Sequence, residues 1–308
     1  ILTTPVISAL SSQFPYLRLT VVVGSRAKGV LEGSRLIHRL VIYDKEAGLV
    51  RKFKFLSELR RERYDCVVDL KNSAVPFLVS TRKRSPVIRF FKETMPRQRY
   101  LEVLKMTGLE TSGESHFDFF SETDEASLLE KLKANGIFAG QGWILVAPLA
   151  ASELKTWRLS GFAEVIQKLL QERQEDILLL GAKRERPLVE PLVRLNPSRV
   201  YNVADQITFR ELAALISRSA LLLSNDSSPM HLGCELKAPV VAIFGPTNAE
   251  HFKREGNLFK VVREPVPCSP CEKPVCRFDR QACFEDLSPE KVFKACKDIL
   301  DLKAVVSS

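Results

Sequence analysis

Residues 221–247 read LLLSNDSSPMHLGCELKAPVVAIFGPT, and this stretch decides the fold. The apolar run 221–223 has the length of a buried strand, and a polar turn follows it. Pro229 fits the first turn of a helix, because the N–H that proline lacks has no partner there. Pro239 ends that helix, and 240–244 predicts the next buried strand. The stretch therefore predicts strand, helix and strand, with a polar turn after each strand.

The first of these turns is a candidate anion site. Asp226, Ser227 and Ser228 stand where a strand ends and a helix begins. Free N–H groups and the dipole at a helix N-terminus favour a phosphate, and the two hydroxyls and His231 add donors. Ligands of open α/β sheets bind outside the carboxyl ends of the strands. The alternative is an ordinary turn in which Asp or Ser caps the helix, and spacing alone leaves both open.

Strands and helices alternate over most of the chain, which indicates parallel sheets with crossover helices. The other expected strands are 17–23, 41–43, 66–70, 87–90, 143–146, 177–180 and 200–203. The other expected helices are 3–14, 25–31, 53–63, 73–81, 125–134, 161–173, 184–195, 209–217 and 288–302.

Polar residues and turn signals interrupt the alternation within 109–142. We therefore expect a front domain over 1–142, a rear domain over 143–287 and a C-terminal helix over 288–308. The chain lacks an initiator methionine, so we expect that it begins inside a longer protein and that a first strand of the front domain precedes it.

Charge is concentrated in the front part. Residues 1–108 hold 21 Lys and Arg against 9 Asp and Glu, a net +12, whereas the remainder holds 25 against 28, a net −3. This favours an anionic partner such as a phosphorylated glycolipid, an anionic membrane surface or nucleic acid. Part of the charge can instead be solvated helix surface, as at 60–63. Nucleic acid lacks support, because neither an RNP-type aromatic strand nor a helix-turn-helix is recognisable.

Four of the seven cysteines cluster in a proline-rich loop as C-x2-C-x4-C-x6-C, namely Cys268, Cys271, Cys276 and Cys283. Four thiols so spaced could bind zinc or an iron–sulfur cluster, or form disulfides. A cytosolic location argues against persistent disulfides. We interpret them as reduced or structural thiols and predict no metal site.

Several common chemistries have no motif here. The chain contains no G-x-G-x-x-G after a strand, no G-x4-G-K-S/T and no D-x-D carboxylate pair. The D-x-D pair is the commonest way in which a sugar-nucleotide enzyme holds a metal on the diphosphate. An enzyme of that class without the pair needs other groups, such as a lysine and a helix N-terminus, to neutralise the departing diphosphate.

The stretch from Asn225 to Leu232, followed by 239–247, resembles the signature of glycosyltransferase family 9, the ADP-heptose:lipopolysaccharide heptosyltransferases. Ser228 stands where that family usually has glycine. The resemblance implies a GT-B fold, in which two Rossmann-like, doubly wound α/β domains face each other across a cleft. It also implies an inverting transferase without a required cofactor, with ADP-heptose as donor and the lipopolysaccharide inner core as anionic glycolipid acceptor. Such an enzyme is expected in the cytoplasm of a Gram-negative bacterium, peripheral to the inner membrane.

The resemblance also assigns the donor site. Residues 147–157 are similar to the family's P-G-A-x4-K-x-W loop, whose lysine contacts the donor phosphates, and Leu149 replaces its glycine. Lys155 is therefore a candidate catalytic residue, or else a surface lysine beside Trp157. Glu211 matches the carboxylate that binds the ribose, or else it caps a helix. The remaining expected donor contacts are Asp226, also a candidate catalytic residue, with Ser227, Ser228, Met230, His231 and Thr247.

Fewer residues of the acceptor side can be identified from the sequence. The family pattern G-D-x-x-x-T-x-P matches at Thr3 and Pro5, which places the expected general base about two positions before Ile1. We therefore expect Thr3 on the acceptor side. Asp69, at the tip of a front-domain strand, is the best carboxylate in this chain for an acceptor role, with a structural role as the alternative.

Two other functions remain open. Ser228 and Leu149 motivate a family relative that uses a different nucleotide sugar or acceptor. A non-catalytic relative that only holds nucleotide or polyanion would show strongly salt-dependent binding to DNA or RNA.

Overall fold

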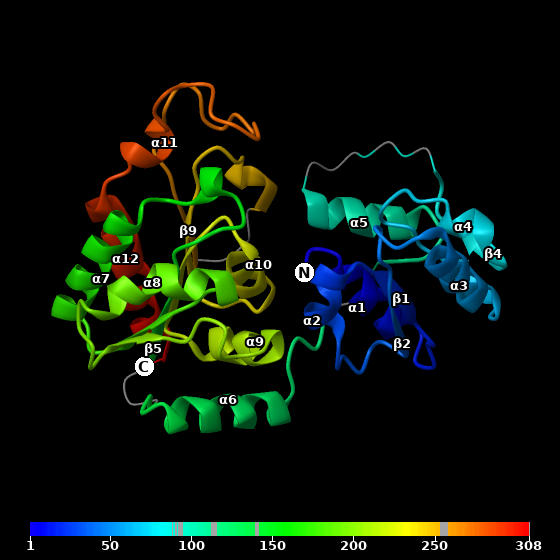
Figure 1. The fold of residues 1–308 in the computed structure, drawn as a ribbon, viewed down its shortest axis with the longest axis horizontal. Helices are drawn as coiled ribbons and strands as arrows, with labels where there is room; N and C mark the ends of the chain where they lie inside the picture. The colour runs from blue at the N-terminus through cyan, green and yellow to red at the C-terminus, as the bar shows by residue number, and fades with distance from the viewer. Residues whose placement is uncertain are drawn as a thin grey trace. The chain divides into compact units, whose positions relative to one another are not determined.

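The computed structural model describes residues 1–87, 89, 91, 95–111, 116–138, 142–252 and 258–307. The chain forms two compact units, Ile1–Phe119 and Phe120–Ser308 (Figure 1). The division falls ahead of the expected boundary at 142/143, because α6 (Glu122–Ala134) packs against α9 (Phe209–Arg218) of the second unit. Helix α12 (Pro289–Ser307) also belongs to that unit, where it packs on α7 (Leu159–Glu172).

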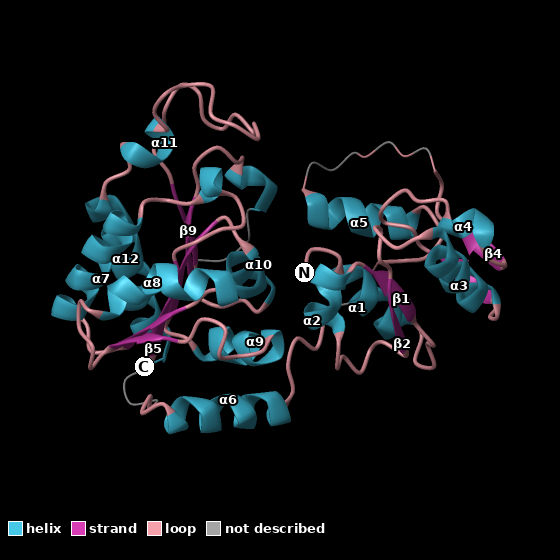
Figure 2. Cartoon of the chain, viewed as in Figure 1, coloured by secondary structure: helices cyan, strands magenta, loops and turns pink. Residues whose placement is uncertain are grey.

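The second unit is built on a six-stranded parallel sheet (Figure 2). In spatial order the strands are β10 (Phe259–Val262), β9 (Val240–Ile243), β8 (Leu221–Asn225), β5 (Trp143–Ala147), β6 (Asp176–Leu179) and β7 (Val200–Asn202). Every residue of β5, β8 and β9 is buried, as expected for strands covered on both faces. The chain winds outward from β5 toward β7, then returns to β8 and winds the other way. This order makes the neighbouring ends of β5 and β8 the topological switch point.

Helices cover both faces of this sheet. Helices α7 and α8 (Arg186–Val193) cover one face, and α9 and α10 (Ser228–Glu235) cover the other. Helix α12 packs against β8, β9 and β10, and a short helix, α11 (Ala282–Glu285), precedes it. The core between helices and sheet holds Trp157, Phe162 and Ile166 without solvent exposure.

The first unit holds two separate two-stranded parallel sheets. One pairs β1 (Thr20–Val23) with β2 (Arg39–Ile42), and the other pairs β3 (Tyr64–Val67) with β4 (Thr81–Arg84). Its helices are α1 (Thr4–Gln13), α2 (Lys28–Leu31), α3 (Leu49–Arg60), α4 (Val75–Leu78) and α5 (Pro96–Lys105). Among the described residues of this unit, small apolar clusters form around Leu104 and around Leu59.

The expected parallel α/β class is confirmed, and the rear-part strands lie within two residues of their expected bounds. The front part differs. The expected helix 73–81 is only α4, and a strand follows at 81–84, where TRKR offers no apolar pattern. The expected strand 87–90 includes two positions, 88 and 90, outside the described residues. Helix α5 and strand β10 were not predicted, the strand because Lys260 interrupts its apolar run.

Among the described residues, no helix combines the length and the apolarity needed to cross a membrane.

Candidate functional site

Asn225, the last residue of β8, fixes the loop that follows β5. Its side chain is fully buried, accepts a hydrogen bond from the Trp157 N–H at 3.1 Å and donates to the Pro148 carbonyl at 2.7 Å. One amide group thus satisfies both ends of the 148–157 loop. Because a buried polar group without a partner is costly, this pairing holds the loop against the carboxyl end of β8.

An ion pair lies at the switch point. Lys155 ends a single 3-10 turn, Glu153–Lys155, and its Nζ is 2.6 Å from Oδ2 of Asp226. The Asp226 side chain is 4% exposed, whereas that of Lys155 is 38% exposed. The carboxylate therefore sits in the protein and holds an ammonium group that still reaches solvent. The structure brings together the two residues that the sequence analysis expected to be catalytic, and it shows that they contact each other.

Helix α10 begins beside this pair. Ser227 is its N-cap residue but makes no side-chain capping hydrogen bond, and its hydroxyl instead lies 3.0 Å from that of Ser224. Ser228 is exposed in the first turn. His231 places Nε2 3.6 Å from Oδ1 of Asp226. The dipole of α10 and the Lys155 ammonium therefore provide positive charge at the same edge of the sheet.

Two other expected donor contacts differ in their burial. Met230 has no exposed surface, which places its side chain in the core rather than at the solvent-facing edge. Thr247 is half-buried in the turn after β9. That turn is held by the following loop, because Ser269 Oγ donates to the Gly245 carbonyl at 2.6 Å and the Cys271 N–H donates to the Pro246 carbonyl at 3.0 Å.

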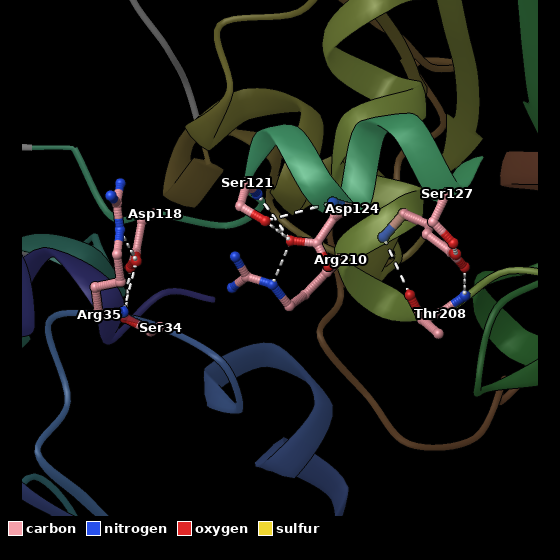
Figure 3. A network of polar contacts seen from close by, with 9 residues as sticks. Ser34, Arg35, Asp118, Ser121, Asp124, Ser127, Thr208 and Arg210 are labelled. Carbon is pink, nitrogen blue, oxygen red and sulfur yellow. Dashed lines mark hydrogen bonds and ion pairs between the residues drawn. The ribbon is translucent and has the colours of Figure 1, made fainter. Parts of the chain in front are cut away.

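Glu211 is fully engaged within the second unit. It forms a capping box with Thr208, whose N–H donates to Oε2 at 2.7 Å. From α6, the Ser127 hydroxyl donates to Oε1 at 2.7 Å, and Lys131 Nζ lies 2.8 Å from the carboxylate. Figure 3 shows Ser127 and Thr208 beside the neighbouring pair of Asp124 and Arg210. The contacts of Glu211 are therefore those of the helix-cap alternative. A ribose could bind the Glu211 carboxylate only by displacing the donors that α6 supplies.

The pKa of Glu211 is set by two opposing effects. Burial disfavours its charged form, but hydrogen bonds from Lys131, from Thr208 and from Ser127 outweigh this and hold the pKa below its usual value. A depressed pKa means that the carboxylate stabilises the fold above the unfolded-state pKa of about 4.3. That contribution is lost as the pH falls below this value through the folded-state pKa.

We expect Glu211→Gln to lower the free energy of unfolding at pH 7 by about 1–3 kcal/mol, because charge-assisted hydrogen bonds are lost. The difference from wild type should shrink as the pH falls from about 5 toward 3. Urea unfolding at several pH values measures it, with the exposed Glu130→Gln on the same helix as Lys131 as the control. A pH-independent difference would contradict this account.

The four-cysteine loop contacts both the turn that holds Lys155 and the turn after β9. Cys268, Cys271, Cys276 and Cys283 are all reduced and line one pocket together with Leu154 and Pro246. Burial raises the pKa of the Cys283 thiol. Within the described ranges, no group of three or more His, Cys, Asp or Glu side chains is arranged to hold a metal ion.

This loop also reaches the Lys155 turn directly. Gln281 Nε2 donates to the Leu154 carbonyl at 2.6 Å, one residue before Lys155. No role for Gln281 or for the side chain of Asn225 is predicted from the sequence. An amide in a strand-end or loop position gives no sequence signal of which carbonyl it will meet. Both residues position the site rather than face it.

The two acceptor-side candidates lie in the first unit. Thr3 is the N-cap residue of α1 and makes no side-chain capping hydrogen bond. Asp69 accepts hydrogen bonds from the backbone N–H groups of Lys71, at 2.8 Å, and of Ser73. These contacts match the structural alternative for Asp69, which stabilises the turn after β3.

Comparisons with known proteins all indicate the same family. The model of "Glycosyltransferase family 9 (heptosyltransferase)" matches residues 97–282. Lipooligosaccharide heptosyltransferase 2 of Campylobacter jejuni is 34% identical over 151 residues, 47% of each chain, so the match spans about half the length of that relative. Lipopolysaccharide heptosyltransferase 3 of Escherichia coli is 25% identical over 275 residues, 80% of each chain.

Solved structures resemble nearly the whole chain. A glycosyltransferase family 9 protein from Veillonella parvula has a TM-score of 0.80 and 22% identity, covering 97% of this chain and 92% of its own. The E. coli heptosyltransferase WaaC with ADP-2-deoxy-2-fluoro heptose has a TM-score of 0.72 and 15% identity, covering 96% and 95%. These likenesses confirm the expected GT-B fold class.

Proposed function

The chain belongs to glycosyltransferase family 9, and we propose that it transfers heptose from ADP-heptose to the inner core of lipopolysaccharide. The observation that carries the proposal is the ion pair of Lys155 and Asp226 beside the N-terminus of α10, at the switch point of the sheet. A nucleotide diphosphate is the ligand class that this edge of a doubly wound sheet suits. The named relatives act as heptosyltransferases, which supports heptose as the sugar.

In the proposed reaction the acceptor hydroxyl attacks the anomeric carbon in line. A new carbon–oxygen bond forms while the bond to the β-phosphate oxygen breaks, and ADP leaves with the bonding electrons. Negative charge grows on the diphosphate in the transition state, so the Lys155 ammonium and the α10 N-terminus stabilise it more than the ground state. The proton of the attacking hydroxyl has to pass to a general base, the role that a carboxylate serves in such a transfer.

Asp226 has a positioning role in this scheme. Its buried carboxylate is 2.6 Å from the Lys155 ammonium and lies near His231, so it fixes where the cation points. A flexible lysine without such a partner would lose side-chain entropy on meeting the diphosphate. The ion pair therefore holds the Lys155 ammonium in position before the donor binds.

Calorimetric titration of ADP and ADP-heptose into the full chain tests the donor site. We expect micromolar binding of both, and an affinity at least tenfold weaker in Asp226→Ala, because Lys155 loses its anchor. Asp65→Ala, at an exposed carboxylate of the first unit, is the matched control and should bind as wild type does. If neither ligand binds, or if Asp226→Ala binds equally well, the donor site is misassigned.

A different donor sugar is the second candidate function. Ser228 is exposed in the first turn of α10, where the family usually has a glycine without a side chain, so its hydroxyl can meet the ligand. Comparing turnover across several nucleotide sugars separates this candidate from ADP-heptose. Donor binding without turnover of any sugar would instead support a non-catalytic relative. We place the proposed enzyme in the cytoplasm, at the surface of the inner membrane.

A further inference from the structure

Helix α3 of the first unit presents large apolar side chains to solvent. Leu49, Val50 and Phe53 are 81%, 83% and 76% exposed. At 3.6 residues per turn, positions three and four residues apart lie along one side of a helix, so Phe53 lies beside both Val50 and Leu49. The three side chains therefore form a continuous apolar surface, which we call the α3 face. Single exposed apolar residues are ordinary, but three together on the first turns of one helix are not.

The rest of α3 shows that this exposure is not a consequence of a loosely held helix. Leu59, on another side of α3, is buried in a cluster with Val41 and Val79. Phe55 also packs against that cluster, and its ring lies 4.8 Å from that of Tyr43. The helix thus has one apolar side for the interior of its own unit and a second one that the unit does not cover.

Cations surround the α3 face. Arg51, Lys52 and Lys54 occupy the same two turns, and within the described part of the chain no ion pair takes up their side chains. The preceding loop adds Lys45 and the acidic pair of Asp44 and Glu46, which leaves 44–54 with a net charge of +2. Glu58, further along the helix, is already paired with Arg39.

We propose that the α3 face inserts into the surface of an anionic phospholipid bilayer. Apolar side chains on a helix flanked by Lys and Arg suit the boundary between lipid headgroups and acyl chains, where cations meet lipid phosphates. Nucleic acid would engage the cations but leave three apolar side chains in water, and a second copy of the chain would bring like charges together. The inference rests on the proposed function in one respect, because a lipid-linked acceptor requires an enzyme at the bilayer surface.

Co-sedimentation with vesicles tests this surface. The full chain is expected to bind vesicles that contain phosphatidylglycerol and to bind pure phosphatidylcholine weakly. Leu49→Ser with Phe53→Ser should lower the partition coefficient at least tenfold. Arg51→Ala with Lys54→Ala should lower it about 25-fold, since each cation near an anionic surface contributes roughly fivefold, and added salt should weaken wild-type binding.

Matched controls lie in the second unit. Leu188→Ser removes an apolar side chain that is 54% exposed on α8, and Lys183→Ala removes an exposed cation nearby. Both should leave vesicle binding unchanged. Thermal unfolding of each variant establishes that it is folded.

Phe53→Trp gives a second, direct readout. The chain has two tryptophans, Trp143 and Trp157, and both are buried, so a new exposed indole would report its own surroundings. Its emission should shift to the blue on adding phosphatidylglycerol vesicles. No shift, or undiminished binding of the Leu49→Ser, Phe53→Ser variant, overturns the inference.

Other outcomes also decide the matter. If the double serine variant lowers the mass in light scattering without changing vesicle binding, the face joins two copies of the chain. If it lowers affinity for an oligonucleotide alone, the partner is nucleic acid. Both results overturn the lipid assignment. Titration of ADP is independent of vesicles, so a chain that binds ADP but not lipid keeps its proposed function and loses only this inference.

Discussion

Lys155→Ala is expected to lower kcat/KM for ADP-heptose by about 10²–10³-fold, the usual effect of removing one preorganised donor from a developing negative charge. Lys155 is the cation that the structure anchors at the switch point, 2.6 Å from the Asp226 carboxylate. Its side chain is partly exposed, so a ligand can reach it. Steady-state transfer assays, with the exposed Lys183→Ala as control, measure the effect.

A double variant separates catalysis from stability in this pair. Lys155→Ala alone leaves the buried Asp226 carboxylate without its cation, which destabilises the fold in its own right. Adding Asp226→Asn removes that unpaired charge and should recover most of the lost stability. The double variant should remain as slow as Lys155→Ala if the ammonium acts on the diphosphate. Recovery of the wild-type rate in the double variant would show that the pair is only structural.

Trp157→Ala is expected to lower the free energy of unfolding of the second unit by about 3–5 kcal/mol, as for other fully buried large side chains. Trp157 has no exposed surface, and its indole N–H donates to the Phe284 carbonyl at 3.1 Å. Its ring packs edge-on against Phe162, with centroids 5.1 Å apart. The variant leaves a cavity in the core between helices and sheet, and it leaves the Phe284 carbonyl with only the hydrogen bond from Arg158 Nη1, at 3.3 Å.

Urea unfolding followed by circular dichroism measures this loss, with Trp157→Phe as the graded control. Phenylalanine keeps most of the apolar contact and loses the hydrogen bond, so its effect should be smaller. Because Trp157 lies two residues after Lys155, Trp157→Ala should also weaken ADP binding. A loss below about 1 kcal/mol would mean that the neighbouring core collapses onto the space.

The sequence predicts the second unit well, because its strands are continuous apolar runs bounded by polar turns. The same turns predict where the candidate site lies, since parallel strands bring their carboxyl ends to one edge. The residue contacts inside the site are less predictable. Nothing in the motif shows that Lys155 pairs with Asp226, or that Met230 turns into the core.

The contacts that the sequence does not indicate depend on tertiary structure. Glu211 lies on a helix N-terminus at the expected edge, but α6, 80 or more residues earlier in the chain, supplies two of the groups that engage its carboxylate. In the first unit, β4 is a short strand in which three of the four residues are charged, and its pairing with β3 rather than any apolar pattern makes it a strand. Local sequence carries no signal for either arrangement.

The amide of Asn225 has a further consequence for how this protein can vary. Because one side chain holds the Pro148 carbonyl and the Trp157 N–H, the two ends of the intervening segment are fixed relative to each other. Residues 149–156 thus form an exchangeable segment, in which the positions other than Lys155 can be replaced while its two ends stay in place. Donor preference could therefore be transferred between relatives by exchanging this segment alone, provided that its length, Lys155 and Asn225 are preserved.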